Sequence, residues 1–196
     1  MKLKVLAVSS VAFFAMAAAA SAQTTVVEPI GSHLPYQRWV DESAVPTPDV
    51  TIEVIETEAG HGCPGRQFDY IACTAPWERK IWIDEAGAVS RRPREIFMHE
   101  LGHNFDADVL PEWARERFDA LEGLGGPWVI TEEPQPMTPS EWFAETYAQC
   151  AMVPFVSLAA MHALGLGPIA GAEPIGGRDA YNKVCRMLKR LQGSRA

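Results

Sequence analysis

Two histidines, His99 and His103, stand four residues apart in the stretch HELGH and constrain the fold more than any other feature of the sequence. In an α-helix, residues at this spacing lie one turn apart on the same face, so both imidazoles can bind a single metal ion. Glu100 follows His99 and would lie close to that ion. The alternative, two imidazoles and a carboxylate buried without a metal, would cost several kcal/mol. The stretch therefore predicts a helix with a metal site.

The segments before this stretch are predicted to form a small sheet. Residues 50–56, VTIEVIE, alternate apolar and polar side chains, as a strand with one buried face does. Residues 80–84, KIWID, are expected to form a second strand at the edge of the sheet, followed by a turn at EAGA. The helix then runs through REIFMHELGHNF, with Ser90 as its cap and Pro93 in its first turn.

Three more helices are predicted after the histidines. Pro111 suits the first turn of a helix through PEWARERFDALEG, which glycines end. Thr138 caps a helix through TPSEWFAETYAQC, with Pro139 in its first turn. The last helix covers residues 181–191 and is amphipathic, and its inward side chains are expected to be Tyr181, Val184, Cys185, Leu188 and Leu191.

Residues 1–22 are predicted to be a signal peptide. A basic start precedes a run of apolar residues, and the small residues ASA at the end of this segment suit a cleavage site. The apolar run is short and no basic stop follows it, which disfavours a membrane anchor. An exported protein, secreted or periplasmic, is therefore expected, without stable membrane association after cleavage.

The mature chain would have 196 − 22 = 174 residues, enough for one hydrophobic core. Cleavage removes two lysines and no acids, so the formal charge falls from −8 to −10. This acidity disfavours nucleic acid or an anionic membrane as a partner. We expect an extended lead-in at residues 23–48 and a single α+β domain at 49–196, in which a short sheet packs on the HELGH helix and further helices follow. The oligomeric state is left open.

Four cysteines, an even number, indicate two disulfides in an exported chain. A structural zinc site is disfavoured because no C-x-x-C pair is present. Of the three possible connectivities, we favour Cys63–Cys73, which closes a local loop, and Cys150–Cys185, which would tie two late helices together.

The third metal ligand must come from elsewhere in the chain. Asp106 lies nearly on the same helix face and could orient a histidine, but its side chain is short for direct ligation. Glu141 is the better candidate, 141 − 103 = 38 residues after His103 on a separate helix. Glu145 shares its face and could accept a histidine N–H. Alternatively, Glu141 only completes a capping box with Thr138.

HELGHNFD followed by EWFAE resembles the catalytic domain of the anthrax lethal factor-like zinc peptidases, which are gluzincins, and small exported bacterial metallopeptidases with the same pairing. The resemblance covers roughly residues 95–150. It implies a zincin-like fold and a zinc ion held by His99, His103 and Glu141. Asp106 stands where this family has an aspartate after its two histidines.

The chain departs from this family at one functional position. Lethal factor has a tyrosine seven residues before the metal glutamate, where this sequence has Pro134. Three other side chains are candidates for the hydrogen-bond donor that stabilises the transition state: Tyr147, Tyr181 and His162.

These observations predict a zinc-dependent endopeptidase in which Glu100 is the general base. The strand at 80–84 would align an extended peptide substrate by backbone pairing. Trp128 and Trp142 would line the cleft, unless they belong to the core, where tryptophans are more common. Two alternatives stay open: a zincin-type metal-binding or regulatory protein that is catalytically inactive, and a structural protein held by disulfides.

Overall fold

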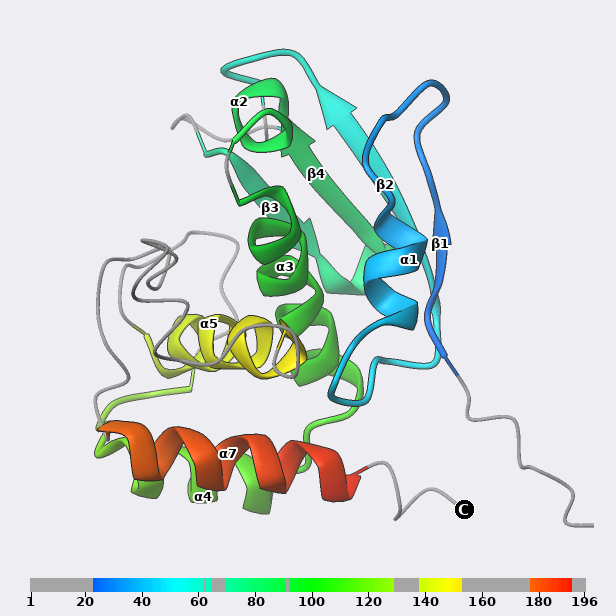
Figure 1. Cartoon of the computed structure of the whole chain (residues 1–196). Coiled ribbons are helices and arrows are strands. Elements are labelled where there is room, and N and C mark those ends of the chain that lie inside the picture. Colours follow the sequence, from blue (N-terminus) through cyan, green and yellow to red (C-terminus); the bar gives the residue numbers. More distant parts are fainter. Residues whose placement is uncertain are drawn as a thin grey trace, which may run out of the picture.

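The computed structural model describes residues 23–61, 63–64, 70–90, 92–128, 138–152 and 177–191. The predicted signal peptide lies outside these ranges. The described part combines a four-stranded sheet with helices, an α+β arrangement as predicted. In Figure 1, helix α3 lies against the sheet with α1 on the same side, α5 crosses α3, and α4 and α7 run together at the far end.

The sheet has the strand order β1-β2-β4-β3. Its strands are β1 (Thr25–Val27), β2 (Thr51–Thr57), β3 (Ala72–Ala75) and β4 (Lys80–Asp84). β1 and β4 each pair in parallel with β2, and β3 pairs antiparallel with β4. In β2, Ile52 and Val54 are buried while Thr51 and Glu53 are exposed, so the predicted alternation is confirmed.

The prediction that residues 80–84 form an edge strand is wrong. β4 has a neighbour on each side, and the edges of the described sheet are β1 and β3. β3 was not predicted because it has only four residues and follows a stretch of sequence rich in glycine. The alternation within KIWID shows which side chains are buried, but it cannot show which strands lie beside it.

The expected extended lead-in is also wrong, because residues 23–48 contribute β1 and helix α1 (Tyr36–Asp41) to the domain. Tyr36 and Val40 are almost completely buried. The ring of Tyr36 lies 5.1 Å from that of Phe97 on α3, a distance typical of packed aromatic pairs. Burial of these side chains against α3 holds a segment that has no clear periodicity of its own.

Helix α3 (Pro93–Asp108) carries the two histidines, as predicted. It follows a 3-10 turn (Pro76–Glu78) and a single helical turn, α2 (Glu85–Ala88), where the sequence predicted only a turn. Ser90 does not cap α3: its Oγ accepts a hydrogen bond from the backbone N–H of Arg92 at 3.1 Å, before the helix begins. Pro93 suits the first position of the helix because it has no N–H to satisfy there and its φ is already helical.

Helix α5 (Pro139–Met152) crosses α3 at close range, and Gly102 lies at the crossing. A Cβ atom at position 102 would lie 2.9 Å from the Cα of Ala144 and 3.1 Å from its carbonyl oxygen. Only glycine therefore lets the two backbones approach this closely. The crossing brings the middle of α3 against the first half of α5, where both sets of predicted ligands lie.

Helices α4 (Glu112–Glu122) and α7 (Gly177–Leu191) pack against each other. Pro111 is the N-cap of α4 rather than its first residue, and Gly123 ends that helix in the left-handed conformation. All the predicted inward side chains of α7 are buried, namely Tyr181, Val184, Cys185, Leu188 and Leu191.

Two disulfides join the cysteines in the predicted pairing. Cys63–Cys73 joins Cys63, which follows β2, to β3, with Cα atoms 5.9 Å apart. Cys150–Cys185 ties α5 to α7, with Cα atoms 5.3 Å apart. Among the described helices, none combines the length and apolar character that a bilayer crossing requires.

Candidate metal centre

Helix α3 presents His99 and His103 on one face, as the spacing predicts. Their ring centroids are 5.0 Å apart. The side chains are only 15% and 12% exposed, so both imidazoles lie in a largely dehydrated site. Such a site strengthens charge interactions and disfavours an unpaired charge.

Helix α5 brings Glu141 to the two histidines. One carboxylate oxygen lies 3.2 Å from Nε2 of His99, and the other lies 3.4 Å from Nε2 of His103. Donor atoms bound to one tetrahedral zinc at about 2.0–2.1 Å are themselves roughly 3.3–3.4 Å apart, and each histidine Nε2 lies about that far from one of the two oxygens of Glu141. One ligand atom from each of the three residues lies within 4.8 Å of the others. The group could therefore hold a metal ion.

Glu141 combines features of the two roles that the sequence allows, a capping residue and a candidate metal ligand. Its backbone N–H donates to Oγ1 of Thr138 at 3.4 Å, as the predicted cap of α5 requires. Its side chain, however, points to the histidines. The backbone of Glu141 thus takes part in capping while its carboxylate faces the candidate metal position.

Glu145, one turn further along α5, faces the other nitrogen of His99. Its Oε2 lies 3.3 Å from Nδ1 of His99, and its Oε1 accepts a hydrogen bond from Gln149 at 3.0 Å. A carboxylate at Nδ1 favours the tautomer that carries its proton there, which leaves Nε2 available to a metal. This is the arrangement expected of Glu145 from its spacing.

The electrostatics of the centre favour a cation. Burial alone lowers the pKa of His99, but hydrogen bonds to Glu141 and Glu145 and the negative charge of Glu100 raise it, and the net pKa lies well above its ordinary value. Burial raises the pKa of Glu141, but its hydrogen bonds to His103 and His99 outweigh this, and the net pKa is lowered. The carboxylates of α3 and α5 thus favour a positive charge at His99.

Glu95 is a member of this charged group that the sequence analysis missed. It is 2% exposed, and burial together with the charge of Glu145 raises its pKa to about 7. The positive charges of Arg92 and His99 lower the pKa of Glu95, and Nε of Arg92 lies 3.8 Å from Oε2 of Glu95. Its position four residues before His99, on the same face of α3, is the signal that could have revealed it.

Glu100, the predicted base, is buried on α3 beside His99, with 8% of its surface exposed. Its backbone carbonyl accepts a hydrogen bond from Nδ2 of Asn104 at 3.0 Å, and the same amide donates to Oγ1 of Thr74 at 2.8 Å. Asn104 therefore ties the turn that carries Glu100 to the edge strand β3.

Asp106 is fully buried, but its observed contacts differ from the one expected with a histidine. Its carboxylate accepts hydrogen bonds from Nε of Arg115 at 2.8 Å and from Nε1 of Trp128 at 2.9 Å. These bonds join the end of α3 to α4 and to the segment that follows α4. The short side chain at this position is thus engaged on the side of α4.

Of the two proposed cleft aromatics, Trp142 belongs to the core and Trp128 packs against it. Trp142 is 5% exposed, and Trp128 packs edge-on against Phe118 and near Phe143. Of the candidate transition-state donors, Tyr147 is fully buried and donates to the carbonyl of Pro46 at 2.8 Å, and Tyr181 is 3% exposed. The third candidate, His162, and Pro134 lie outside the described residues.

Comparison of the chain with family models, with curated proteins and with solved structures found no match. Membership of the gluzincins therefore stays a prediction from the two motifs.

Proposed function

We propose that the protein is an exported zinc-dependent endopeptidase. One observation carries the proposal: the Nε2 atoms of His99 and His103 both face the carboxylate of Glu141 at 3.2 and 3.4 Å. A ligand set of two histidines and one glutamate is that of the catalytic zinc sites of thermolysin-like enzymes, which keep a further position for water. Zinc is the proposed ion because two imidazoles with one carboxylate suit it better than they suit calcium or magnesium.

The residues of the chain divide the chemistry between them. When bound, zinc would supply Lewis-acid chemistry that lowers the pKa of water and polarises a carbonyl group. Glu100 takes a proton from the attacking water and passes it to the nitrogen of the leaving amine. Glu145 holds His99 by its Nδ1, which keeps the imidazole in the orientation that ligation needs.

The substrate in this proposal is a peptide that pairs with strand β3. β3 is an edge of the described sheet, and the hydrogen bond between Thr74 and Asn104 places it beside α3. An extended peptide added to β3 would gain backbone hydrogen bonds, as in other cases of strand addition. In this proposal β3 aligns the substrate, a role that the sequence had suggested for residues 80–84, which form β4. Nucleic acid is not a proposed partner, because the chain is acidic.

The proposed location is the periplasm or the medium. Both disulfides fit an oxidising compartment. Residues 1–22, predicted to be a signal peptide, would direct the export of the protein.

The direct test combines metal analysis with a peptide digest. Elemental analysis of the purified protein should find about one zinc per chain, and a peptide library should be cleaved in a chelator-sensitive manner. Glu100→Gln should keep the zinc and the fold but lose at least about two orders of magnitude in rate, because glutamine cannot accept the proton. Normal rates in this variant would contradict the mechanism.

The alternative is a zincin-type metal-binding or regulatory protein without turnover. The burial of Tyr147 and Tyr181 favours it, because neither hydroxyl is exposed to a substrate. A protein that holds one zinc ion and cleaves no member of the library would support this alternative. A protein that purifies without zinc and does not take it up would instead leave a structural role.

A further inference from the structure

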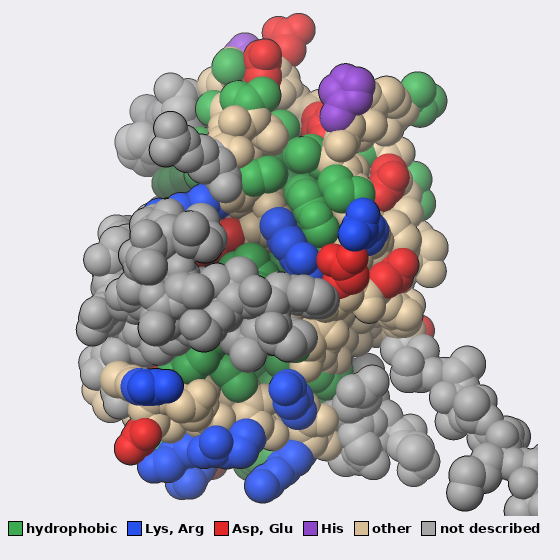
Figure 2. Space-filling model, viewed as in Figure 1, with side chains coloured by type: hydrophobic (Ala, Val, Ile, Leu, Met, Phe, Trp, Pro, Cys, Tyr) green, Lys and Arg blue, Asp and Glu red, His purple; other side chains and the backbone are tan. Residues whose placement is uncertain are grey.

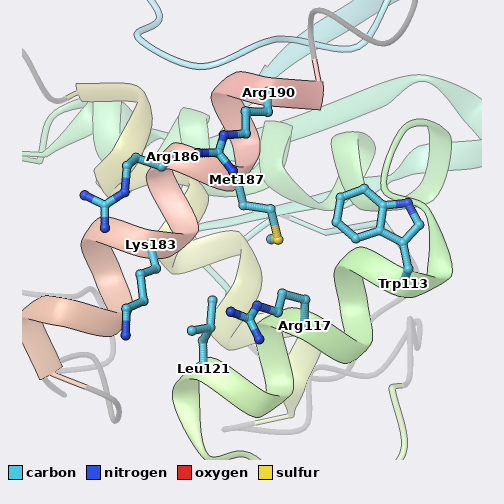
Figure 3. A pocket seen from close by; sticks show the side chains of 7 residues that line it. All are labelled: Trp113, Arg117, Leu121, Lys183, Arg186, Met187 and Arg190. Atoms are coloured by element: carbon cyan, nitrogen blue, oxygen red, sulfur yellow. The ribbon is translucent and has the colours of Figure 1, made fainter.

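The surface between α4 and α7 holds a groove of about 350 Å³ that shares no lining residue with the candidate metal centre (Figure 3). Leu121 of α4 and Met187 of α7 form its apolar part. Trp113, 55% exposed, lies near one end of the groove. Because Trp113 also lines the groove, its indole extends the apolar surface that the groove offers.

The rest of the lining is positively charged: Arg117 from α4 and Lys183, Arg186 and Arg190 from α7. No acidic side chain lines the groove, and within the described ranges these four side chains form no ion pair. Figure 2 shows basic side chains gathered at the end of the molecule where Figure 1 places α4 and α7.

This charge is unusual for the chain as a whole. α7 carries five of the 17 Lys and Arg residues but only one of the 25 Asp and Glu residues. The complete chain has a formal charge of −8. A local concentration of one sign on a molecule of the opposite sign directs binding to that place.

We propose that the groove binds an acidic segment of a partner protein. Carboxylates of the segment would pair with the cations on both sides of the groove, and an apolar side chain would occupy the space over Leu121 and Met187. Charge-assisted hydrogen bonds to arginine are among the strongest that a surface can offer. The proposal does not depend on a bound metal or on peptidase activity.

A peptide fits this surface better than an anionic membrane does. The apolar floor is recessed, with Met187 8% exposed, so a flat bilayer would meet the cations without reaching the floor. The acidic charge over the rest of the molecule would also be repelled by an anionic bilayer at any point within about 10 Å, the screening length at moderate salt.

The test is a binding titration with the full mature protein and a fluorescein-labelled peptide of glutamates around two leucines. The two variants are Lys183→Glu, in the groove, and Lys189→Glu, on the same helix but outside the groove lining. Both make the same change of charge at an exposed position. We expect Lys183→Glu to weaken binding at least about tenfold and Lys189→Glu to weaken it less than about threefold. Thermal unfolding of both variants checks that the fold is kept.

Three outcomes would overturn the proposal. The first is no binding by the wild-type protein, or binding only to phosphatidylglycerol vesicles. The second is an equal loss in both variants, which would show a response to total charge alone. The third is unchanged affinity for a peptide with serines in place of the leucines, which would show that the apolar floor has no part.

Discussion

The candidate metal centre and the basic groove use charged side chains in opposite ways. At the crossing of α3 and α5, the charges are largely buried, and His99 faces a carboxylate at each ring nitrogen. Between α4 and α7, cations lie at the surface and form no ion pairs within the described part of the chain. The centre takes its counter-charges from its own chain, whereas the groove would need another molecule to supply them.

The difference has an energetic basis. Buried charges must be paired because dehydration is expensive, so removal of one member leaves the others in an unfavourable state. Exposed cations stay hydrated and affect stability by little. Substitutions in the two regions should therefore affect different properties of the protein and with different magnitudes.

The largest effect is expected at Glu141. Glu141→Gln should lose most zinc affinity, more than a hundredfold, because a neutral amide is a poor ligand for a dication. Helix content should change little, since the capping bond to Thr138 uses the backbone of residue 141. Glu145→Gln should lose roughly 10–100-fold, the usual range for a partner of a ligand. Isothermal titration with zinc and circular dichroism measure the two properties.

The reverse order would break this assignment. If Glu141→Gln holds zinc tightly while Glu145→Gln does not, the ligand is Glu145 and Glu141 is a capping residue only. Neither variant should alter the affinity for the acidic peptide, and a parallel loss there would show that the centre and the groove are coupled.

The next prediction concerns stability instead of metal affinity, and it concerns the disulfide that joins α5 of the candidate centre to α7 of the groove. Replacement of Cys150 and Cys185 by alanine opens a loop of 35 residues, and the chain-entropy model gives a loss of about 4 kcal/mol in the free energy of unfolding. Urea denaturation of the variant and the oxidised parent measures it. A loss below about 1 kcal/mol would mean that α7 is held on α5 by packing alone.

A smaller effect is expected at the helix crossing. Gly102→Ala places a Cβ 2.9 Å from the backbone of Ala144, so α3 and α5 must separate, with a loss of about 1–3 kcal/mol in stability and weaker zinc binding. The control is Gly125→Ala, where an added Cβ meets no atom within 4 Å. If both variants unfold at the same temperature, the close approach does not limit the crossing.

The smallest effect is expected in the groove. Lys183→Glu should change the free energy of unfolding by less than about 0.5 kcal/mol, because the side chain is exposed and has no ion pair to lose among the described residues. Thermal denaturation at low salt checks this value. A stabilisation above about 1 kcal/mol would show that the cations repel one another strongly even without a ligand, and would sharpen the contrast with the centre.

The candidate centre could be predicted because its geometry is local. His99 and His103 share a face by their spacing alone, and so do Glu141 and Glu145. The cap at Thr138 and the glycine after α4 gave reliable helix boundaries. The two helices were joined in the prediction by the need for a third ligand, which Glu141 could supply from a separate helix, and by the resemblance to a family. Nothing in either segment alone shows that they cross.

The parts that were not predicted depend on contacts between distant residues. β1 pairs with β2 across an intervening helix, and β4 is central only because β3 lies beside it. The groove combines Arg117 with Lys183, which come from separate helices. Asp106 shows the same limit: its helical position suggested a histidine partner, but the partners it has are Arg115 and Trp128. Periodicity reports the buried face of an element and not its neighbours.

The crossing at Gly102 also has a use in protein design. The three candidate metal ligands, His99, His103 and Glu141, come from two helices. Gly102, at the contact between these helices, sets how closely the ligand atoms approach one another. A designed pair of helices with histidines four apart on one, a glutamate on the other and a glycine between them would carry the same ligand set. Such a scaffold would test how small a protein can be and still form a metal site.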